Sequence, residues 1–597
     1  MSSSSQALPQ DLATRARGLL LGAAVGDALG WPQEMRSNIV GGTRAREVVA
    51  KPEYREWERN SGTQFARYQE TVRAGEYSDD TQLLLAVARA CGKGEAWWEH
   101  LTGVELPAWL VYQRGGGRAV IAASRSWAAG QPPWLPVTKS ARSAEGPAKY
   151  FKAGANGVAM RIAPHVLLCL SDSDPSRLVG RVIADGITTH GHARALVGGA
   201  AHAVTLRAAL LRSGTMAYGD LLDQLGEKEF WDAVDFREAV PEDWSRCFES
   251  QVGERPDDAW SQAVNETRDL VKIATKALSR GAIADDEAAF AEMGCFDPKV
   301  NGAGTVTAVA AVYAAARSAA RPMSGLLRTA FLKSADTDTL ASMTASILGA
   351  LHGPDWLADL ARGVQDADYV ARFECLARGI SEADTSKRTT VFKDGDASVQ
   401  SRDPAVSGQG LKKFTEALAD RTIGDTGEFV DGRPFEVREK VHLAAKGDIT
   451  VTRWRLKLAD DQTIVIDETR KGKGRSRDGE RQQRPPEVRA ATEPRSSVSR
   501  ITLLVNDLPS VAGFYRNVIG LPVHGTGGGF VELGPGLRLR QREKPSPAAP
   551  DALLEIIVPS LTDVSRRLGP DAPAILSGAL EVKDPEGRPI VVRERVM

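Results

Sequence analysis

Between Asp11 and about Ala383, apolar residues recur with the 3.6-residue period of an α-helix, and Ala and Leu are the commonest of them. The clearest helical patterns cover residues 81–90, 158–170, 193–211 and 340–351. Segments rich in Gly or Pro, such as residues 115–117 and 131–136, separate these stretches. The pattern therefore predicts an all-α domain over residues 11–385, built as a bundle of helices.

The pattern changes in the last third of the chain. Residues 435–445 and 448–469 alternate between apolar and polar positions and contain Val, Ile, Thr and Trp, as strands do. They predict a small β-rich module over residues 409–469. Residues 470–499 are crowded with Arg and Lys and have almost no apolar content, which predicts a flexible basic linker.

Beyond this linker, strand and helix patterns alternate in two short halves. We expect a C-terminal α+β domain over residues 500–597. Its predicted elements are strands at 501–505, 530–540, 553–558 and 590–596 and helices at 508–518 and 560–568.

Composition excludes several classes of protein. Lys and Arg total 76 against 77 for Asp and Glu, so no net field would attract the whole chain to nucleic acid or to an anionic membrane. The longest apolar stretches, such as residues 306–316, are too short and too rich in Ala to span a bilayer. The polar start lacks the pattern of a secretory signal, and five widely spaced cysteines form no CxxC motif. Together these features predict a cytoplasmic protein.

Two acidic clusters stand directly before apolar helical patterns. They are Ser78-Asp79-Asp80 and Asp336-Thr337-Asp338-Thr339. Each cluster alone has a plain structural explanation, because Ser, Thr and Asp are preferred at helix starts. If the two helix starts face each other, however, their four carboxylates need cations to remain ionised together. Oxygen ligands of this kind select Mg²⁺ or Mn²⁺ over zinc.

Five sequence motifs occur along the chain in the same order as in a known protein family. They are residues 22–30 (GAAVGDALG) with Glu34, residues 75–82 (GEYSDDTQ), residues 156–164 (NGVAMRIAP), Thr189-His190, and residues 336–339 (DTDT). Over residues 14–380 the chain resembles the ADP-ribosylglycohydrolase family, which includes the dinitrogenase-reductase-activating glycohydrolase and hydrolases of ADP-ribosylated arginine and serine. The resemblance implies an all-α fold with two Mg²⁺ ions in a central cleft, and Mn²⁺ as an alternative ion.

The resemblance also implies roles for individual residues. The implied metal ligands are Ser78, Asp79, Asp80, Asp336, Asp338 and Thr339. Glu34 would close over the metals, and either Glu34 or a ligand carboxylate such as Asp80 or Asp336 would act as general base. The implied substrate-binding residues are Asn156, Gly157, Met160 and His190. Backbone amides at Gly157 and at residues 302–304, including Gly302 and Gly304, are candidate donors to the pyrophosphate.

The chain departs from the family pattern at three places. Ser78 stands where Thr is usual, Ala155 replaces a Gly, and Ser334-Ala335 replaces a Gly pair. Serine keeps the hydroxyl, so metal binding should survive. Without these glycines the loops are stiffer and slightly bulkier, which should change how well the pocket fits its substrate.

Residues 500–597 resemble the glyoxalase, bleomycin-resistance and dioxygenase superfamily through residues 501–508, 514–521 and 584–587. That resemblance implies two βαβββ halves. The superfamily's metal ligands would fall near Arg500, Leu553 and Val591, which cannot bind a divalent ion. A ligand-binding or dimerising domain and a structural appendage therefore both remain as interpretations.

The sequence thus favours a Mg²⁺-dependent hydrolase that removes ADP-ribose from a modified target. The alternative is a non-catalytic protein that binds ADP-ribose or a drug. The leaving group stays open between an arginine guanidinium, a serine oxygen, a nucleobase and a small-molecule hydroxyl. For the basic linker a solvated spacer is favoured over nucleic-acid binding, and the sequence does not indicate an oligomeric state.

Overall fold

The computed structural model describes residues 8–34, 49–63, 66–135, 141–378, 403–443, 449–471 and 501–594. Short gaps within these ranges fall at 173, 215–216, 218, 233, 520, 522, 528–529, 534–536, 542–553, 559–560, 569–572, 574–578 and 586–588. The chain forms two compact units, residues 1–476 and residues 477–597. The predicted basic linker lies outside the described residues from position 472 onward.

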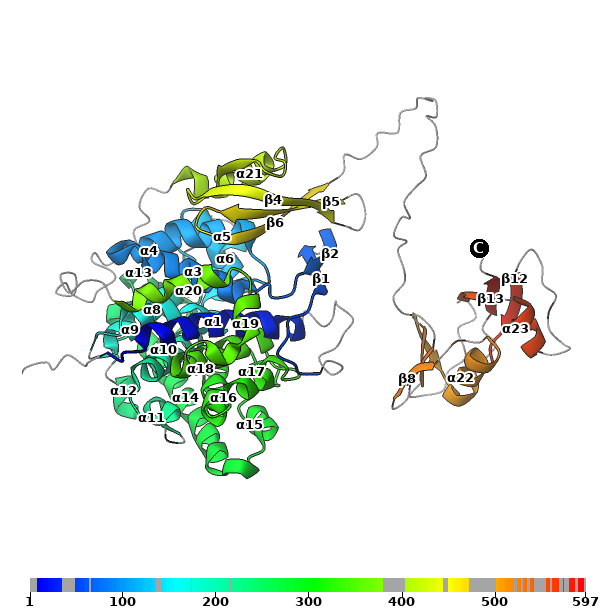
Figure 1. Cartoon of the computed structure of the whole chain (residues 1–597), viewed down its shortest axis with the longest axis horizontal. Coiled ribbons are helices and arrows are strands. Elements are labelled where there is room, and N and C mark those ends of the chain that lie inside the picture. Colours follow the sequence, from blue (N-terminus) through cyan, green and yellow to red (C-terminus); the bar gives the residue numbers. More distant parts are fainter. Residues whose placement is uncertain are drawn as a thin grey trace, which may run out of the picture. The chain divides into compact units, whose positions relative to one another are not determined.

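The first unit is mainly helical (Figure 1). The helices that build the site are α1 (Leu12–Gly30), α3 (Asp79–Cys91), α10 (Ala193–Leu211), α16 (Gly304–Ser318) and α18 (Thr337–His352). The others are α4 (Trp97–His100), α5 (Leu106–Tyr112), α6 (Arg118–Ala128), α7 (Ala141–Tyr150), α8 (Ala163–Leu168), α9 (Ser176–Gly186), α11 (Asp220–Gly226), α12 (Lys228–Asp232), α13 (Glu242–Val252), α14 (Pro256–Ser279), α15 (Asp286–Glu292), α17 (Pro322–Ala330), α19 (Asp359–Gly363), α20 (Ala367–Ala371) and α21 (Gly408–Leu418).

Helices α1, α10, α16 and α18 are buried on nearly every side and form the centre of the unit. Helices α1 and α18 approach each other closely. A stripe of glycines, Gly18, Gly22, Gly26 and Gly30, lies along α1 at four-residue spacing. A Cβ added at Gly26 would lie only 2.3 Å from the carbonyl oxygen of Ala341, so the two backbones touch without intervening side chains. This contact fixes the position of the C-terminal end of α1 relative to the start of α18.

Three of the four predicted helical stretches are confirmed, as α3, α10 and α18. The helical pattern predicted over residues 158–170 is divided into two helical pieces. A 3₁₀ turn, Ala159–Arg161, is followed by the short helix α8. Pro164 explains the break, because proline fits the first turn of a helix but cannot continue a helix that began before it.

A hairpin of β1 (Trp57–Thr63) and β2 (Ala66–Val72) was not expected from the sequence. The predicted β-rich region forms an antiparallel sheet in the order β3-β4-β5-β6, with β3 (Thr426–Glu428), β4 (Pro434–Leu443), β5 (Ile449–Leu458) and β6 (Thr463–Lys471). This sheet belongs to the same compact unit as the helices. Figure 1 shows it over α5, with α21 beside it.

The second unit contains two similar halves. The first has β7 (Ile501–Val505), α22 (Leu508–Asn517), β8 (Val523–Gly527), β9 (Phe530–Leu533) and β10 (Leu537–Gln541), in sheet order β7-β10-β9-β8. The second has β11 (Leu554–Val558), α23 (Leu561–Leu568), β12 (Ala579–Lys583) and β13 (Pro589–Glu594), in order β11-β13-β12. Apolar residues of both halves share one core. The predicted α+β character is therefore confirmed.

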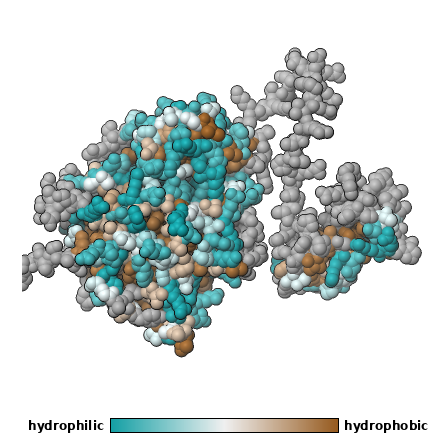
Figure 2. Space-filling model, viewed as in Figure 1, coloured by the Kyte–Doolittle hydropathy of each residue, from teal (hydrophilic) through white to brown (hydrophobic). Residues whose placement is uncertain are grey.

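In the described part of the chain, no helix has the length and apolar character needed to cross a membrane. Hydrophilic residues predominate on the face of the first unit drawn in Figure 2.

Candidate active site

The two acidic helix starts lie together, beside the C-terminal end of α1. Ser78 is the N-cap of α3 and Asp336 is the N-cap of α18. The carbonyl of Gly30 accepts a hydrogen bond from the Thr337 hydroxyl at 2.9 Å, and a Cβ at Gly30 would clash with the Thr337 carbonyl. The end of α1 is thus tied to the start of α18, so the predicted meeting of the two clusters has a structural cause.

A buried carboxylate of α1 holds the start of α3. Asp27 accepts hydrogen bonds from the amide of Ser78 at 3.0 Å and from the amide and hydroxyl of Thr81 at 3.0 and 2.6 Å. These amides belong to the first turn of α3, where helix geometry leaves N–H groups without intrahelical partners. Asp27 therefore acts as a cap supplied by a different helix. Burial raises its pKa, and the hydrogen bonds from Thr81 and Ser78 oppose this shift.

Carboxylates are concentrated between the two helix starts. One carboxyl oxygen each of Glu34, Asp336 and Asp338 lie within 4.8 Å of one another. Burial raises the pKa of Asp338 well above its usual value, and the neighbouring charges of Glu34, Asp336 and Asp80 add to the shift. Asp80 behaves in the same way, because burial is reinforced by Asp27, Asp79 and Asp336.

One acceptor atom in this cluster is left over. The Oδ2 atom of Asp80 is buried and has no hydrogen-bond partner within the described residues. A buried oxygen without a partner is costly unless something binds it. The set of crowded carboxylates with an orphaned oxygen has the chemistry of a site for hard divalent cations.

The segment around Asn156 closes one side of the carboxylate cluster. The Asn156 amide group donates to Oδ2 of Asp336 at 3.0 Å, and its backbone N–H donates to the carbonyl of Gly302 at 2.9 Å. An isolated β-bridge joins Ala155 and Ala303. A Cβ at Gly302 would lie 3.1 Å from the same Asp336 oxygen, so these two loops and Asp336 form one compact structure.

His190 and Gly157 are in direct contact, since a Cβ at Gly157 would lie 2.7 Å from Cε1 of His190. Burial, with a smaller effect of Arg161, lowers the pKa of His190 to about 3, so the ring is neutral near pH 7. The Thr189 hydroxyl lies 2.8 Å from Nδ1 of this ring. Met160 is buried in the adjoining turn, where its amide donates to the Asn156 carbonyl at 3.2 Å. The structure thus brings these four residues together, because Asn156, Gly157 and Met160 share one segment and His190 contacts Gly157.

Gly304 differs from the expectation of an amide that faces a pyrophosphate. Its N–H donates to the carbonyl of Gly154 at 3.0 Å, so the protein itself engages this donor. The missing side chain serves packing, because a Cβ would lie 2.5 Å from the carbonyl oxygen of Arg194. Gly304 therefore lets α16 approach the start of α10, and Gly302 is the member of this pair that lies at the carboxylate cluster.

The substitution of a glycine pair by Ser334-Ala335 has a visible consequence. Ser334 adopts a φ of 67°, in the left-handed region that favours glycine. A non-glycine residue there costs on the order of 1 kcal/mol. The strain lies two residues before Asp336 and marks the loop that delivers this carboxylate to the site.

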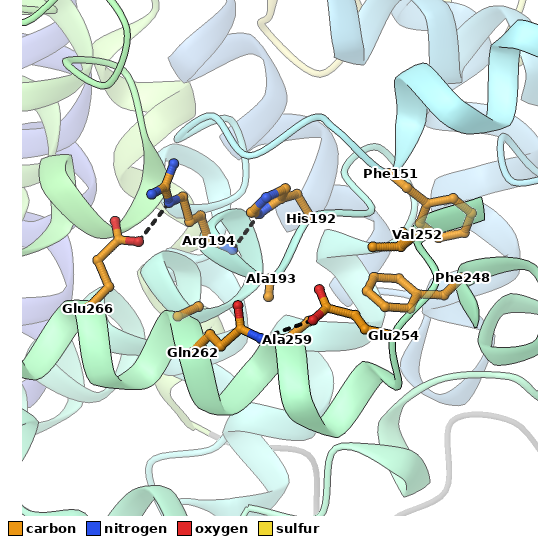
Figure 3. Close-up of a pocket in the computed structure, with 11 residues that line it drawn as sticks. Phe151, His192, Ala193, Arg194, Phe248, Val252, Glu254, Ala259, Gln262 and Glu266 are labelled. Atoms are coloured by element: carbon orange, nitrogen blue, oxygen red, sulfur yellow. Dashed lines mark hydrogen bonds and ion pairs between the residues drawn. The ribbon is translucent and has the colours of Figure 1, made fainter. Parts of the chain in front are cut away.

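A cavity of about 240 Å³ lies near the segment that carries Asn156, between the start of α10 and helices α13 and α14 (Figure 3). Its apolar wall contains Phe151, Phe248 and Val252. Its polar lining consists of His192, Arg194, Glu254, Gln262 and Glu266. Nδ1 of His192 lies 3.2 Å from the position of a Cβ at Gly154, two residues before Asn156. The cavity thus adjoins the loop that carries Asn156.

Several neighbours of the site were not anticipated from the sequence. The effect of Asp27 on the pKa of Asp80 depends on a tertiary contact that the sequence pattern does not reveal. Gly115, with a φ of 92°, lies against Asp79, where a Cβ would be 2.9 Å from Oδ1. Trp31 follows α1 directly and packs edge-to-face on Trp57 of the hairpin, with ring centroids 5.2 Å apart. Only the glycine run at 115–117 gave a local signal of a tight backbone approach.

Comparisons with known proteins identify the family to which the chain belongs. No curated protein matches the chain. Among solved structures, an ADP-ribosylglycohydrolase-related protein complex is 20% identical, with a TM-score of 0.37, over 62% of this chain and 99% of that chain. An Agrobacterium tumefaciens protein of unknown function is 17% identical, with a TM-score of 0.16, over 17% of this chain and 95% of that chain. The family model for ADP-ribosylglycohydrolases matches residues 8–389, so the chain belongs to the ADP-ribosylglycohydrolase family.

Proposed function

We propose that this protein is a Mg²⁺-dependent hydrolase that cleaves the N- or O-glycosidic bond between ADP-ribose and a modified target. The observation that carries the proposal is the carboxylate cluster of Glu34, Asp336 and Asp338, whose oxygens lie within 4.8 Å of one another in a member of a hydrolase family. Such a cluster stores mutual repulsion that only bound cations or protons relieve.

The residues present fit two Mg²⁺ ions, with Mn²⁺ as an alternative. Ser78, Asp79, Asp80, Asp336, Asp338 and Thr339 would hold them, together with Glu34. The orphaned Oδ2 atom of Asp80 supports this assignment, because a cation would satisfy it. When bound, such ions polarise substrate oxygens and lower the pKa of a coordinated water.

The residues of the chain then have distinct tasks. Glu34, or one of the carboxylates Asp80 and Asp336, accepts the proton of the attacking water. The water oxygen bonds to the anomeric carbon through an oxocarbenium-like state as the bond to the leaving group breaks. The leaving nitrogen or oxygen takes up a proton. Asn156 keeps Asp336 oriented through its 3.0 Å hydrogen bond.

We place the nucleobase end of ADP-ribose in the cavity of about 240 Å³ shown in Figure 3. The support is that one loop connects the cavity to the carboxylate cluster. Asn156 of this loop contacts Asp336, and Gly154, two residues earlier, borders His192 of the cavity. Cofactor and nucleotide sites typically combine an apolar wall with a few polar groups, as this cavity does. A Phe248→Ala variant should raise KM more than it lowers kcat.

The decisive experiment measures release of free ADP-ribose from a panel of substrates. The panel contains ADP-ribosylated arginine, serine, nucleic acid and small-molecule acceptors, each incubated with Mg²⁺ and with a chelator. We expect release from at least one acceptor, which the chelator abolishes. Binding of ADP-ribose without release from any acceptor would support the alternative, a non-catalytic ADP-ribose or drug-binding protein.

We propose that residues 477–597 contribute no catalytic metal. The resemblance of this unit to the glyoxalase and bleomycin-resistance superfamily remains a hypothesis. Of the three positions where that superfamily would place ligands, the described one, Val591, is a buried apolar residue of β13. A protein that ends at Ser476 should hydrolyse a minimal substrate at the full-length rate. Loss of that activity in a folded truncated protein would place the second unit in the active site.

A further inference from the structure

The sheet of β3–β6 lies outside residues 8–389, which match the family model, yet it packs into the same compact unit as the helices. Two arginines of β5, Arg453 and Arg455, reach from this sheet to the β1–β2 hairpin and to the loop before α3. Their side chains are only 7% and 14% exposed. Buried arginines are costly unless paired, so their partners indicate what the sheet holds in place.

Arg455 pairs with the residue that leads into the first acidic cluster. Its Nη2 atom lies 2.5 Å from Oε1 of Glu76, and Glu76 stands two residues before Ser78. The other oxygen of Glu76 accepts from Arg114 at 2.7 Å and from the amide of Arg73 at 3.1 Å. Glu76 is therefore held by arginine side chains on both of its oxygens.

Arg114 extends the same chain of contacts to Asp79. Its backbone N–H donates to Oε1 of Gln82 in α3 at 3.2 Å. The next residue, Gly115, lies against the Asp79 carboxylate. The position of Glu76 thus affects both the turn that carries Asp79 and the loop that packs on it.

Arg453 begins a second chain of contacts, which leads toward Glu34. It pairs with Glu70 of the hairpin, and Glu70 also pairs with Arg59 and Arg114. The guanidinium groups of Arg59 and Arg114 lie 4.9 and 5.5 Å from the centre of the Trp31 ring. Trp31 stands three residues before Glu34.

We infer that Arg453 and Arg455 are positioning residues, through which the appended sheet holds the Ser78-Asp79-Asp80 turn and the Glu34 turn in their relative places. Among the described residues, the ion pairs of the two arginines lead to Glu70 and Glu76 and not to the carboxylate cluster itself, so each acts through Glu70, Glu76 and Arg114. The consequence for catalysis rests on the proposed function, whereas the effect on backbone order and cation affinity does not.

The test uses Arg455→Met in the full-length protein, with no substrate present. Hydrogen exchange should show faster exchange of the amides at residues 77–82. Calorimetric titration with Mn²⁺ should show an affinity lower by about ten- to a hundredfold, the usual effect of losing a residue that supports metal ligands. Arg455→Lys keeps the charge and should recover part of both effects.

Arg438→Met is the matched control, because Arg438 lies on the neighbouring strand β4, is exposed, and forms an ion pair with Glu436 of its own strand at 3.0 Å. It should change neither measurement. A double variant separates positioning from general loosening: in a Glu76→Gln background, Arg455→Met should have little further effect on Mn²⁺ affinity.

Any of three results would overturn the inference. One is an Arg455→Met protein whose exchange and Mn²⁺ affinity match those of Arg438→Met. The others are faster exchange spread equally over distant helices such as α14, and effects that add fully in the Glu76→Gln background. If no substrate is hydrolysed, the exchange measurement still decides the inference on its own.

Discussion

Asp338→Asn should stabilise the metal-free protein while abolishing its activity. The substitution removes one charge at almost constant volume, and Oδ1 can still accept the Thr339 amide hydrogen bond of 2.9 Å. Two unit charges 4.8 Å apart, the limit within which the Glu34, Asp336 and Asp338 oxygens lie, repel by about 3.5 kcal/mol at an effective dielectric constant of about 20. Proton uptake relieves part of this repulsion. We therefore expect the free energy of unfolding to rise by about 1–3 kcal/mol.

The assay is denaturant unfolding in chelator and in excess Mg²⁺, paired with an activity measurement. Mg²⁺ should stabilise the native-sequence protein, because a ligand that binds only the folded state shifts the unfolding equilibrium. The Asp338→Asn variant should gain much less from Mg²⁺. Its rate should fall by at least about a hundredfold, since a metal supplies several kcal/mol of transition-state stabilisation.

Asp185→Asn is the matched control with the opposite sign. Asp185 is equally buried, but it pairs with Arg161 at 2.7 Å and with His165 at 3.2 Å. Burial would raise its pKa, yet the charge of Arg161 and the hydrogen bonds from His165 and Arg161 lower it, so neutralisation should destabilise the protein. If Asp338→Asn also destabilises the protein in chelator, the carboxylates of the cluster do not repel one another and the argument for cations fails.

Three further predictions concern other parts of the helical unit. Glu34→Ala should lower kcat sharply and leave ADP-ribose affinity within a few-fold; unchanged hydrolysis would remove Glu34 from the mechanism. Gly26→Ala should cost at least about 2 kcal/mol in chemical denaturation because its Cβ meets the α18 backbone at 2.3 Å, whereas Gly180→Ala, in open space on α9, should stabilise slightly. Burial lowers the pKa of His202 to about 3, so folding excludes a proton that the unfolded ring binds near pH 6.5. Stability should fall by about 2 kcal/mol from this ring between pH 7 and 5, and unfolding of His202→Leu, followed over the same range, should lack that part of the loss.

The helical architecture was predictable because local periodicity and burial agree. Residues 193–211 form α10 with the predicted bounds, since a run rich in Ala and Leu suits a helix buried on all sides. The break before α8 depends on a single residue, Pro164, which the hydrophobic pattern does not take into account. The hairpin at residues 57–72 was missed because charged residues occupy it. Glu70 is buried there, and its pKa is lowered against the effect of burial by Arg114, Arg59 and Arg453, which the hydrophobic pattern cannot reveal.

The candidate site likewise has features that the sequence predicts and features that depend on tertiary contacts. Ser78-Asp79-Asp80 and residues 336–339 could be read from the sequence because the residues of each cluster are contiguous and begin a helix. Their alignment could not, because it depends on contacts such as the one between Glu76 and Arg455, which are 379 positions apart. A carboxylate cluster is useful only if its members are held against their own repulsion. The residues that hold it, Asp27 by capping α3 and the β5 arginines by anchoring Glu70 and Glu76, therefore lie in distant segments, where stable structure is available to oppose that repulsion.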